Sequence, residues 1–72
     1  PGTVVTEILR SYVGVMRFVS RQLANREDAA DVTQTSVARI IARAQSVEVP
    51  FPRAALYRTA QNLVFDLRRQ AM

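Results

Sequence analysis

A chain of 72 residues forms one domain at most, near the lower size limit for folding without a disulfide or a bound metal. It contains no cysteine and no histidine, which excludes disulfides, thiolate metal sites and catalytic groups built on either residue. A hydrophobic content of 49% permits a packed core, and a net charge of +4, with arginine as the only basic residue type, predicts a basic surface.

The first predicted helix covers roughly residues 3–24. Leu9, Met16 and Phe18 widen its apolar face, so we expect contacts from two sides. Gly14 lies mid-helix, where glycine costs about 1 kcal/mol relative to alanine, and it indicates either close packing or simple tolerance. The main apolar stripe recurs at steps of three or four, as in a helix, and consists of Val5, Ile8, Tyr12, Val15, Val19 and Leu23.

The second predicted helix covers roughly residues 26–44. We expect Asn25 to cap its start, with Asp28 reaching back in the manner of a capping box. One face of the helix is polar without being strongly charged, and it consists of Asp31, Gln34, Thr35 and Arg39. The predicted core positions are Ala30, Thr33, Val37, Ile40 or Ile41, and Ala44.

Residues 45–52 interrupt the helical pattern, because Pro50 and Pro52 stand on either side of Phe51. The fixed φ of Pro52 suits the first turn of a following helix, and Pro50 stiffens the approach to it. This segment therefore predicts a stiff loop with an exposed aromatic side chain. The alternative is that Phe51 is a hydrophobic staple, packed back onto the helix that it precedes.

The third predicted helix covers roughly residues 53–70, with Leu56, Ala60, Leu63 and Leu67 as its buried stripe. The opposite stripe combines arginine, asparagine and an aromatic residue, which are the side chains that clamp phosphate, contact base edges and stack on bases. Its aromatic residue could instead cover the gap left by a neighbouring domain. The stripe consists of Arg58, Asn62, Phe65 and Arg69, with Gln61 and Arg68 beside it.

Three helices joined by short connections predict a small all-α three-helix bundle with a proline-containing loop between the second and third helices.

Charge is distributed unevenly along the chain. Residues 1–36 carry four arginines and four acidic residues, whereas residues 37–72 carry six arginines and only Glu48 and Asp66. This asymmetry indicates that one end meets a polyanion and the other a neutral or protein-like surface, although a solvated basic face is the plainer interpretation. Glu27, Asp28 and Asp31 lie at a helix start, where capping explains the first two. We therefore expect no catalytic site and no metal site.

Two segments in sequence, EDAADVTQTSVARIIA at 27–42 and PRAALYRTAQNLVFDLRRQ at 52–70, resemble the second conserved region of the extracytoplasmic-function sigma factors. That region has an acidic, alanine-rich start, Asp-x-x-Gln-Glu, a variable loop, and Pro-Arg-x-x-Leu-aromatic-Arg-x-Ala-x-Asn. Thr35 stands where the family usually has an acidic residue, and Val37 where it usually has phenylalanine, which weakens the expected polymerase contact. Within the family, residues 64–69 are most similar to the iron-starvation branch. The matching positions are Asp31, Gln34, Pro52, Arg53, Leu56, Tyr57, Arg58, Ala60, Asn62, Asp66, Arg68 and Arg69.

The resemblance implies two separate binding surfaces, one for RNA polymerase and one for DNA. The polymerase-binding surface would dock on the coiled coil of the RNA polymerase β′ clamp, and it would consist of Asp31, Gln34, Thr35 and Arg39. The DNA-binding surface would hold the non-template strand of the promoter minus-ten element, with one base turned into a pocket made by the loop. Arg58, Arg68 and Arg69 would hold phosphates, and Asn62 with loop backbone groups would contribute base readout. The full set implied for DNA is Phe51, Arg53, Tyr57, Arg58, Asn62, Arg68 and Arg69.

The resemblance also implies the wider context. Residues 1–72 would be a single domain of a longer, two-domain sigma factor, without a cofactor, and an anti-sigma factor that spans the membrane would be a partner. No apolar run approaches the roughly 20 residues needed to cross a bilayer, and the N-terminus does not read as a signal peptide, so we expect a cytoplasmic protein.

Two other functions fit parts of the pattern. A helix-turn-helix module that binds duplex DNA would need a short turn before its recognition helix, whereas residues 45–52 form a long connection with two prolines. A helical domain that binds only proteins would explain the apolar excess of the first helix. The sigma-factor resemblance explains the same excess as a surface for an inhibitory partner or for the second domain.

Overall fold

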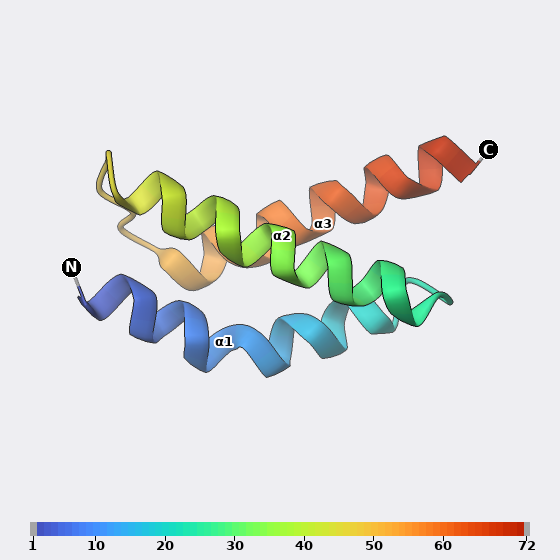
Figure 1. Cartoon of the computed structure of the whole chain (residues 1–72), viewed down its shortest axis with the longest axis horizontal. Helices are drawn as coiled ribbons and strands as arrows, with labels where there is room; N and C mark the ends of the chain where they lie inside the picture. The colour runs from blue at the N-terminus through green and yellow to red at the C-terminus, as the bar shows by residue number, and fades with distance from the viewer. Residues whose placement is uncertain (1, 72) are drawn as a thin grey trace.

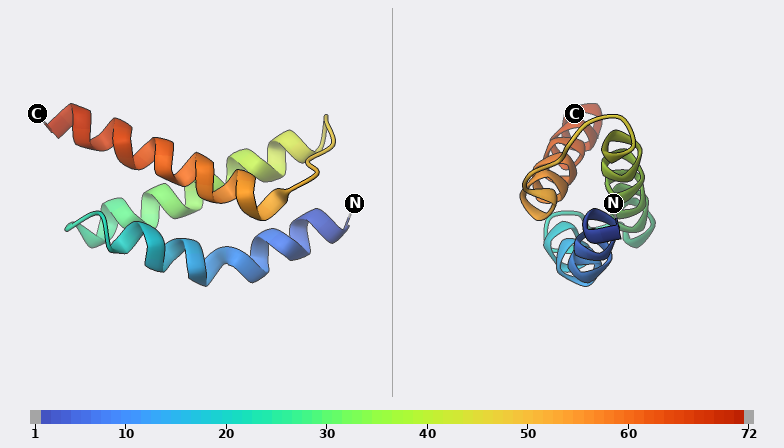
Figure 2. Two further views of the ribbon diagram at one scale, coloured as in Figure 1. Left: turned by 180° about the vertical axis from the view of Figure 1, so that it is seen from behind. Right: turned by 90° about the vertical axis from the view of Figure 1, so that its left-hand side faces the viewer.

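The computed structural model describes the backbone of residues 2–71 and the side chains of residues 4–70. This part of the chain consists of three α-helices, without any strand: α1 is Gly2–Ser20, α2 is Arg26–Ala44 and α3 is Pro52–Ala71. Each helix packs against the other two, and an end-on view shows them at the corners of a triangle (Figures 1 and 2). The prediction of a small all-α three-helix bundle is confirmed.

The start of α2 is fixed by Asn25. Its backbone is extended, with φ −85° and ψ 121°, and its side-chain oxygen accepts a 3.0 Å hydrogen bond from the backbone N–H of Asp28. Within the described residues the Asp28 carboxylate makes no return bond, so only half of the predicted capping box is present. Because the chain turns at residues 21 and 22 to reach this cap, α1 ends at Ser20 and not at residue 24.

The start of α3 is fixed by Pro52. The carbonyl oxygen of Phe51 accepts a 3.0 Å hydrogen bond from the backbone N–H of Ala55, which makes Phe51 the N-cap and Pro52 the first helical residue. A proline at this position loses no hydrogen bond, because the first N–H groups of a helix have no partner within it. The connection between α2 and α3 therefore covers residues 45–51, with Pro50 inside it.

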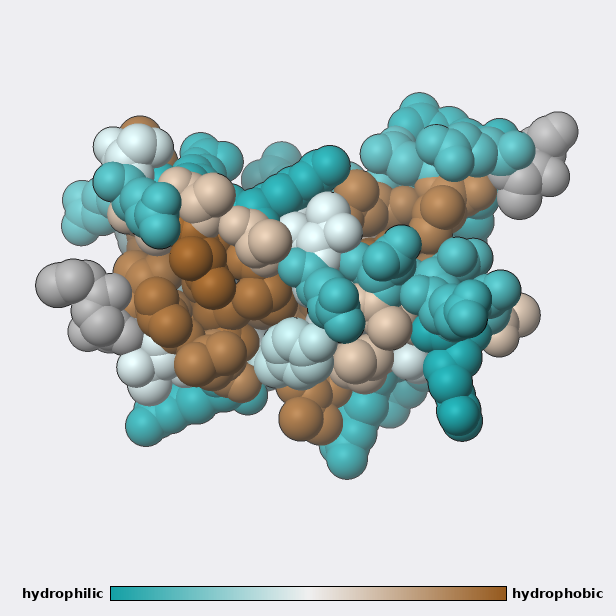
Figure 3. Space-filling model, viewed as in Figure 1, coloured by the Kyte–Doolittle hydropathy of each residue, from teal (hydrophilic) through white to brown (hydrophobic). Residues whose placement is uncertain are grey.

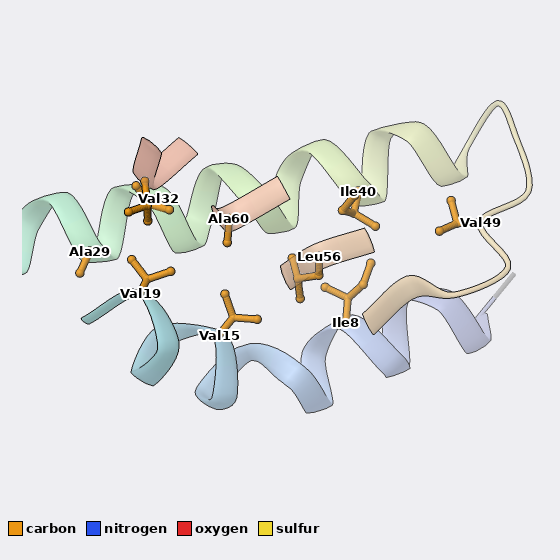
Figure 4. Packing of buried hydrophobic residues seen from close by; sticks show 10 residues of the cluster. Ile8, Val15, Val19, Ala29, Val32, Ile40, Val49, Leu56 and Ala60 are labelled. Atoms are coloured by element: carbon orange, nitrogen blue, oxygen red, sulfur yellow. The ribbon is translucent and has the colours of Figure 1, made fainter. Parts of the chain in front are cut away.

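The core lies along the centre of the triangle (Figure 4). Side chains of α1 point toward both other helices, and Val49 adds one side chain from the loop. Two of the deepest side chains are polar: Thr33 and Ser36 are fully buried, and their hydroxyl groups donate to the carbonyl oxygens four residues earlier, at 2.8 and 2.7 Å. The buried apolar residues are Ile8, Val15, Val19, Ala29, Val32, Ile40, Val49, Leu56, Ala60 and Val64.

The predicted core faces were partly wrong. In α2 the most buried positions include Ala29, Val32 and Ser36, while Ala30 and Val37 are only half-buried. In α3 Val64 is fully buried, and the predicted Leu63 and Leu67 are half-buried. Each helix touches two neighbours, so its deepest residues point between them, and the large apolar residues of the predicted stripe lie to one side. Val5, also predicted to be buried, is 38% exposed at the edge of α1.

Gly14 is explained by close packing between α1 and α3. A Cβ atom at this position would lie 2.5 Å from the hydroxyl oxygen of Tyr57. The Tyr57 ring also makes an edge-to-face contact with Phe18, with ring centroids 5.2 Å apart. A residue without a side chain at position 14 therefore lets Tyr57 fill the seam between the two helices. None of the described helices is long and apolar enough to cross a membrane.

Candidate nucleic-acid interface

The predicted outward stripe of α3 exists as a continuous exposed face. Arg58, Asn62, Phe65 and Arg69 are all exposed, and Phe65 keeps 50% of its surface accessible. They lie opposite the core residues of the same helix, so packing of the bundle fixes their direction. Toward the C-terminal end, the stripe borders a shallow depression of about 570 Å³, lined by Asn62, Phe65, Asp66, Arg68 and Arg69.

Phe51 points into solvent at the start of this stripe, with 74% of its surface exposed. The alternative of a hydrophobic staple is wrong, because a staple is formed by the residue before the N-cap, and Phe51 is itself the N-cap. Its neighbour Val49 is 7% exposed and anchors the loop in the core. The loop is therefore fixed to the core by Val49, and it directs the aromatic side chain of Phe51 into solvent.

Two cavities flank Phe51 and share part of the loop as their common wall. The polar cavity has a volume of about 320 Å³ and lies between the end of α2 and the first turns of α3. The apolar groove has a volume of about 770 Å³ and lies between the first turns of α1 and α3. Residues of the polar cavity include Arg43, Glu48 and Arg58, and those of the apolar groove include Val4, Glu7, Arg53 and Tyr57.

The arginines near the loop are largely unpaired. Among the described residues the only ion pair joins Arg69 to Asp66, so Arg43 and Arg58 have no carboxylate partner. The guanidinium group of Arg53 lies over the Tyr57 ring, 5.8 Å from its centroid, which is cation–π geometry. Unpaired guanidinium groups beside an exposed aromatic ring are suited to a polyanion that also offers flat bases.

Two of the residues predicted to bind DNA are engaged within the bundle. Tyr57 is half-buried and faces α1, where it packs against Phe18 and Gly14, so it does not belong to the outward stripe. The Arg68 guanidinium donates to the carbonyl oxygen of Gln22 at 3.1 Å. Arg68 remains exposed, but its charge is directed toward the end of α1.

The sequence interpretation missed three residues near this interface. Arg43 and Glu48 line the polar cavity only because of the path of the loop, which no local pattern reveals. Gln22 joins the end of α1 to α3, since its side-chain amide and that of Gln61 each donate to the other, at 3.1 and 3.0 Å. These two residues are 39 positions apart in sequence, and their identities carry no signal of pairing.

The residues predicted to bind polymerase lie on a different part of the surface. Asp31, Gln34 and Arg39 are exposed, and Thr35 is half-buried. The structure brings three of the four together along a groove of about 310 Å³ between α2 and α3, whereas Gln34 lies outside its lining. The groove is lined by Asp28, Asp31, Val32, Thr35, Arg39, Leu63, Asp66, Leu67 and Gln70.

The described residues include no group of three or more acidic, cysteine or histidine side chains that could hold a metal ion. Comparisons of the chain with protein-family models, with curated proteins and with solved structures give no significant match. A functional assignment therefore depends on the sequence motifs and on the geometry of the two surfaces described above.

Proposed function

We propose that this chain is the promoter-melting domain of an alternative sigma factor of the extracytoplasmic-function type. In this proposal it binds the RNA polymerase β′ clamp through α2, and it binds the non-template strand of the minus-ten element through the 45–51 loop and α3. The observation that carries the proposal is Phe51, an aromatic side chain held outward between two cavities at the start of a stripe of arginine, asparagine and phenylalanine.

The loop supplies what strand separation requires. Unstacking a base step costs a few kcal/mol, and an aromatic side chain that stacks on the exposed base returns about 1–3 kcal/mol. Phe51 is accessible for such stacking without any rearrangement of the core, and the adjacent cavities offer space for a base that has left the stack. Arg58 and the arginines at the end of α3 would contact phosphates, which raises affinity without adding sequence information.

The groove between α2 and α3 supports the polymerase contact. It presents acidic and hydroxyl groups together with Arg39. It does not reach the loop, and it meets the outward stripe of α3 only at Asp66, the partner of Arg69. A surface of this mixed polarity fits a charged protein helix better than a nucleic acid, because Asp28 and Asp31 would repel phosphates. The two surfaces would therefore be used at the same time.

A hydrophobic surface across α1 and α2 supports a further protein contact (Figure 3). Hydrophobic residues gather over the N-terminal half of α1 and the adjoining half of α2 (Figure 3). Independently of this view, α1 exposes Val5, Leu9 and Val13 at steps of four. In the proposed function this surface receives an anti-sigma factor or the second sigma domain, and the protein acts in the cytoplasm. The same surface favours the second candidate, a domain that binds only proteins.

Fluorescence anisotropy tests the proposal directly. The purified domain would be titrated into labelled minus-ten oligonucleotides, either as the non-template single strand or as duplex, at low and moderate salt. We expect preferential binding of the single strand, with affinity that falls as salt rises. Preference for duplex would favour the helix-turn-helix alternative, and no binding at either salt concentration would favour the protein-binding alternative.

A further inference from the structure

The polar cavity beside Phe51 contains an unusual combination of charges. Arg43 comes from the last turn of α2, Glu48 from the loop and Arg58 from α3, and all three side chains are exposed at the cavity wall. None of them forms an ion pair, since among the described residues only Arg69 and Asp66 do. The charged groups of these three side chains are therefore free to contact a ligand.

Glu48 is the informative member of this group. Residues 37–72 contain only two acidic residues, and the other one, Asp66, is paired with Arg69. A carboxylate in the basic half of the molecule repels phosphate, so it weakens backbone binding instead of adding to it. An ionised carboxylate accepts hydrogen bonds and donates none, so it suits a group that presents donors, and on a nucleobase these donors are N–H groups.

We propose that the polar cavity receives one unstacked base and that Glu48 selects a base with an exocyclic amino group over its keto counterpart. This inference rests on the proposed function, and it adds which of the two cavities is used and which class of base is preferred. The amino group would donate to the Glu48 carboxylate, while Arg43 or Arg58 donates to the ring nitrogen or carbonyl oxygen beside it. A keto oxygen at the same place would face the carboxylate and be repelled.

The shape of the cavity agrees with this assignment. Its floor is apolar, with Ile40, Val49 and Ala55 in contact with the core, and Phe51 forms one wall against which a flat ring would stack. The larger groove on the other side of Phe51 carries Glu7 and Arg53, but the Arg53 guanidinium is already directed onto the Tyr57 ring. The polar cavity therefore offers more free hydrogen-bond donors and acceptors to a base than the apolar groove does.

The test uses single-stranded minus-ten oligonucleotides in which one position at a time carries cytosine or uracil, or adenine or hypoxanthine. Each pair exchanges an amino group for a keto group and places a proton on the ring nitrogen beside it, with little change of shape, so the contacts with Glu48 and with the arginine are both reversed. We expect one position at which the amino base binds about tenfold more tightly, as for one well-formed base contact. Glu48→Gln should reduce that ratio to about threefold or less, because an amide can donate to a keto oxygen as well as accept.

Glu7→Gln is the matched control, because it removes the same charge from the rim of the apolar groove and should leave the ratio unchanged. Both substitutions are expected to tighten binding of all oligonucleotides slightly, through the loss of one negative charge. If Glu48→Gln retains the tenfold ratio, or if no position shows a preference, the inference is overturned while single-strand binding stands. If the wild-type domain binds no single strand, the proposed function fails together with the inference.

Discussion

The side-chain amides of Gln22 and Gln61 form a reciprocal pair across the seam between α1 and α3, with N···O distances of 3.1 and 3.0 Å. Gln22 also accepts a hydrogen bond from Arg68 through its backbone carbonyl oxygen. The turn that ends α1 is therefore bound to α3 both through the side chain of Gln22 and through its backbone. Gln61 is next to Asn62 in sequence, so this pair also helps to fix the rotation of the outward stripe.

Removal of either amide should destabilise the bundle. We expect Gln22→Ala and Gln61→Ala each to lower the free energy of unfolding by about 1–2 kcal/mol, because a half-buried amide loses both hydrogen bonds. The double variant should be less destabilised than the sum, with a coupling energy near 1 kcal/mol. Urea unfolding measures all three, with Gln34→Ala as the exposed control; additive losses would mean that the pair contributes nothing as a pair.

A second prediction concerns Gly14 and Tyr57. Gly14→Ala gains about 1 kcal/mol in helix propensity, but its methyl group would meet the Tyr57 hydroxyl. In a Tyr57→Phe background the hydroxyl is absent, so Gly14→Ala should be more favourable there by about 1 kcal/mol or more. Thermal unfolding of the four proteins gives this difference. Equal effects in both backgrounds would show that the close approach has no energetic consequence.

Phe51 should matter for binding and not for folding. Phe51→Ala removes one stacking surface worth about 1–3 kcal/mol, so single-strand affinity should fall roughly 5- to 150-fold. The melting temperature should stay almost unchanged, because most of the side chain is in solvent. Val47→Ala is the control within the same loop, since Val47 is an apolar residue with 50% of its surface exposed and lies outside both cavities. An equal loss of affinity in the two variants would argue against stacking.

The salt dependence of binding shows which arginines contact phosphates. Arg58 has no ion pair, so Arg58→Ala should reduce the slope of log affinity against log salt by about 0.7 for a single strand. Arg68→Ala combined with Arg69→Ala should also flatten the slope, whereas Arg17→Ala, which removes the same charge from α1, should not. An unchanged slope for Arg58→Ala would remove this residue from the phosphate contact.

We expect Asn62 to contribute to discrimination among minus-ten DNA sequences. Asn62→Ala should weaken discrimination among minus-ten sequences more than it weakens average binding, because its amide can contact a base edge and carries no charge. Anisotropy against a small oligonucleotide library measures both quantities. Equal losses for every sequence would contradict a role in readout.

The sequence predicted those features of the fold that depend on neighbouring residues. The bounds of α2, the Asn25 cap and the first-turn position of Pro52 follow from short patterns, and the structure has all of them. The buried faces were less well predicted, because their direction depends on two packing partners at once. Val64 and Ser36 gave no strong signal in a pattern centred on leucine and isoleucine.

The candidate interface also contains features that the local sequence predicts and features that depend on contacts between distant residues. Exposure of Arg58, Asn62 and Arg69 follows from their helical spacing against the core stripe, which the sequence contains. The inward direction of Tyr57 does not, because it depends on the absence of a side chain at Gly14, 43 positions earlier. The polar cavity likewise arises from the path of a loop whose position is set by one buried residue, Val49.

The most direct test of the central claim joins the two proposed surfaces in one titration. The affinity of the domain for the non-template single strand would be measured by anisotropy with and without a fragment of the β′ clamp coiled coil, using wild type and Asp31→Ala. We predict that the fragment strengthens single-strand binding by the wild type and has a smaller effect on the variant, whose DNA surface is intact. Binding that prefers duplex and ignores the clamp fragment would contradict the proposed function.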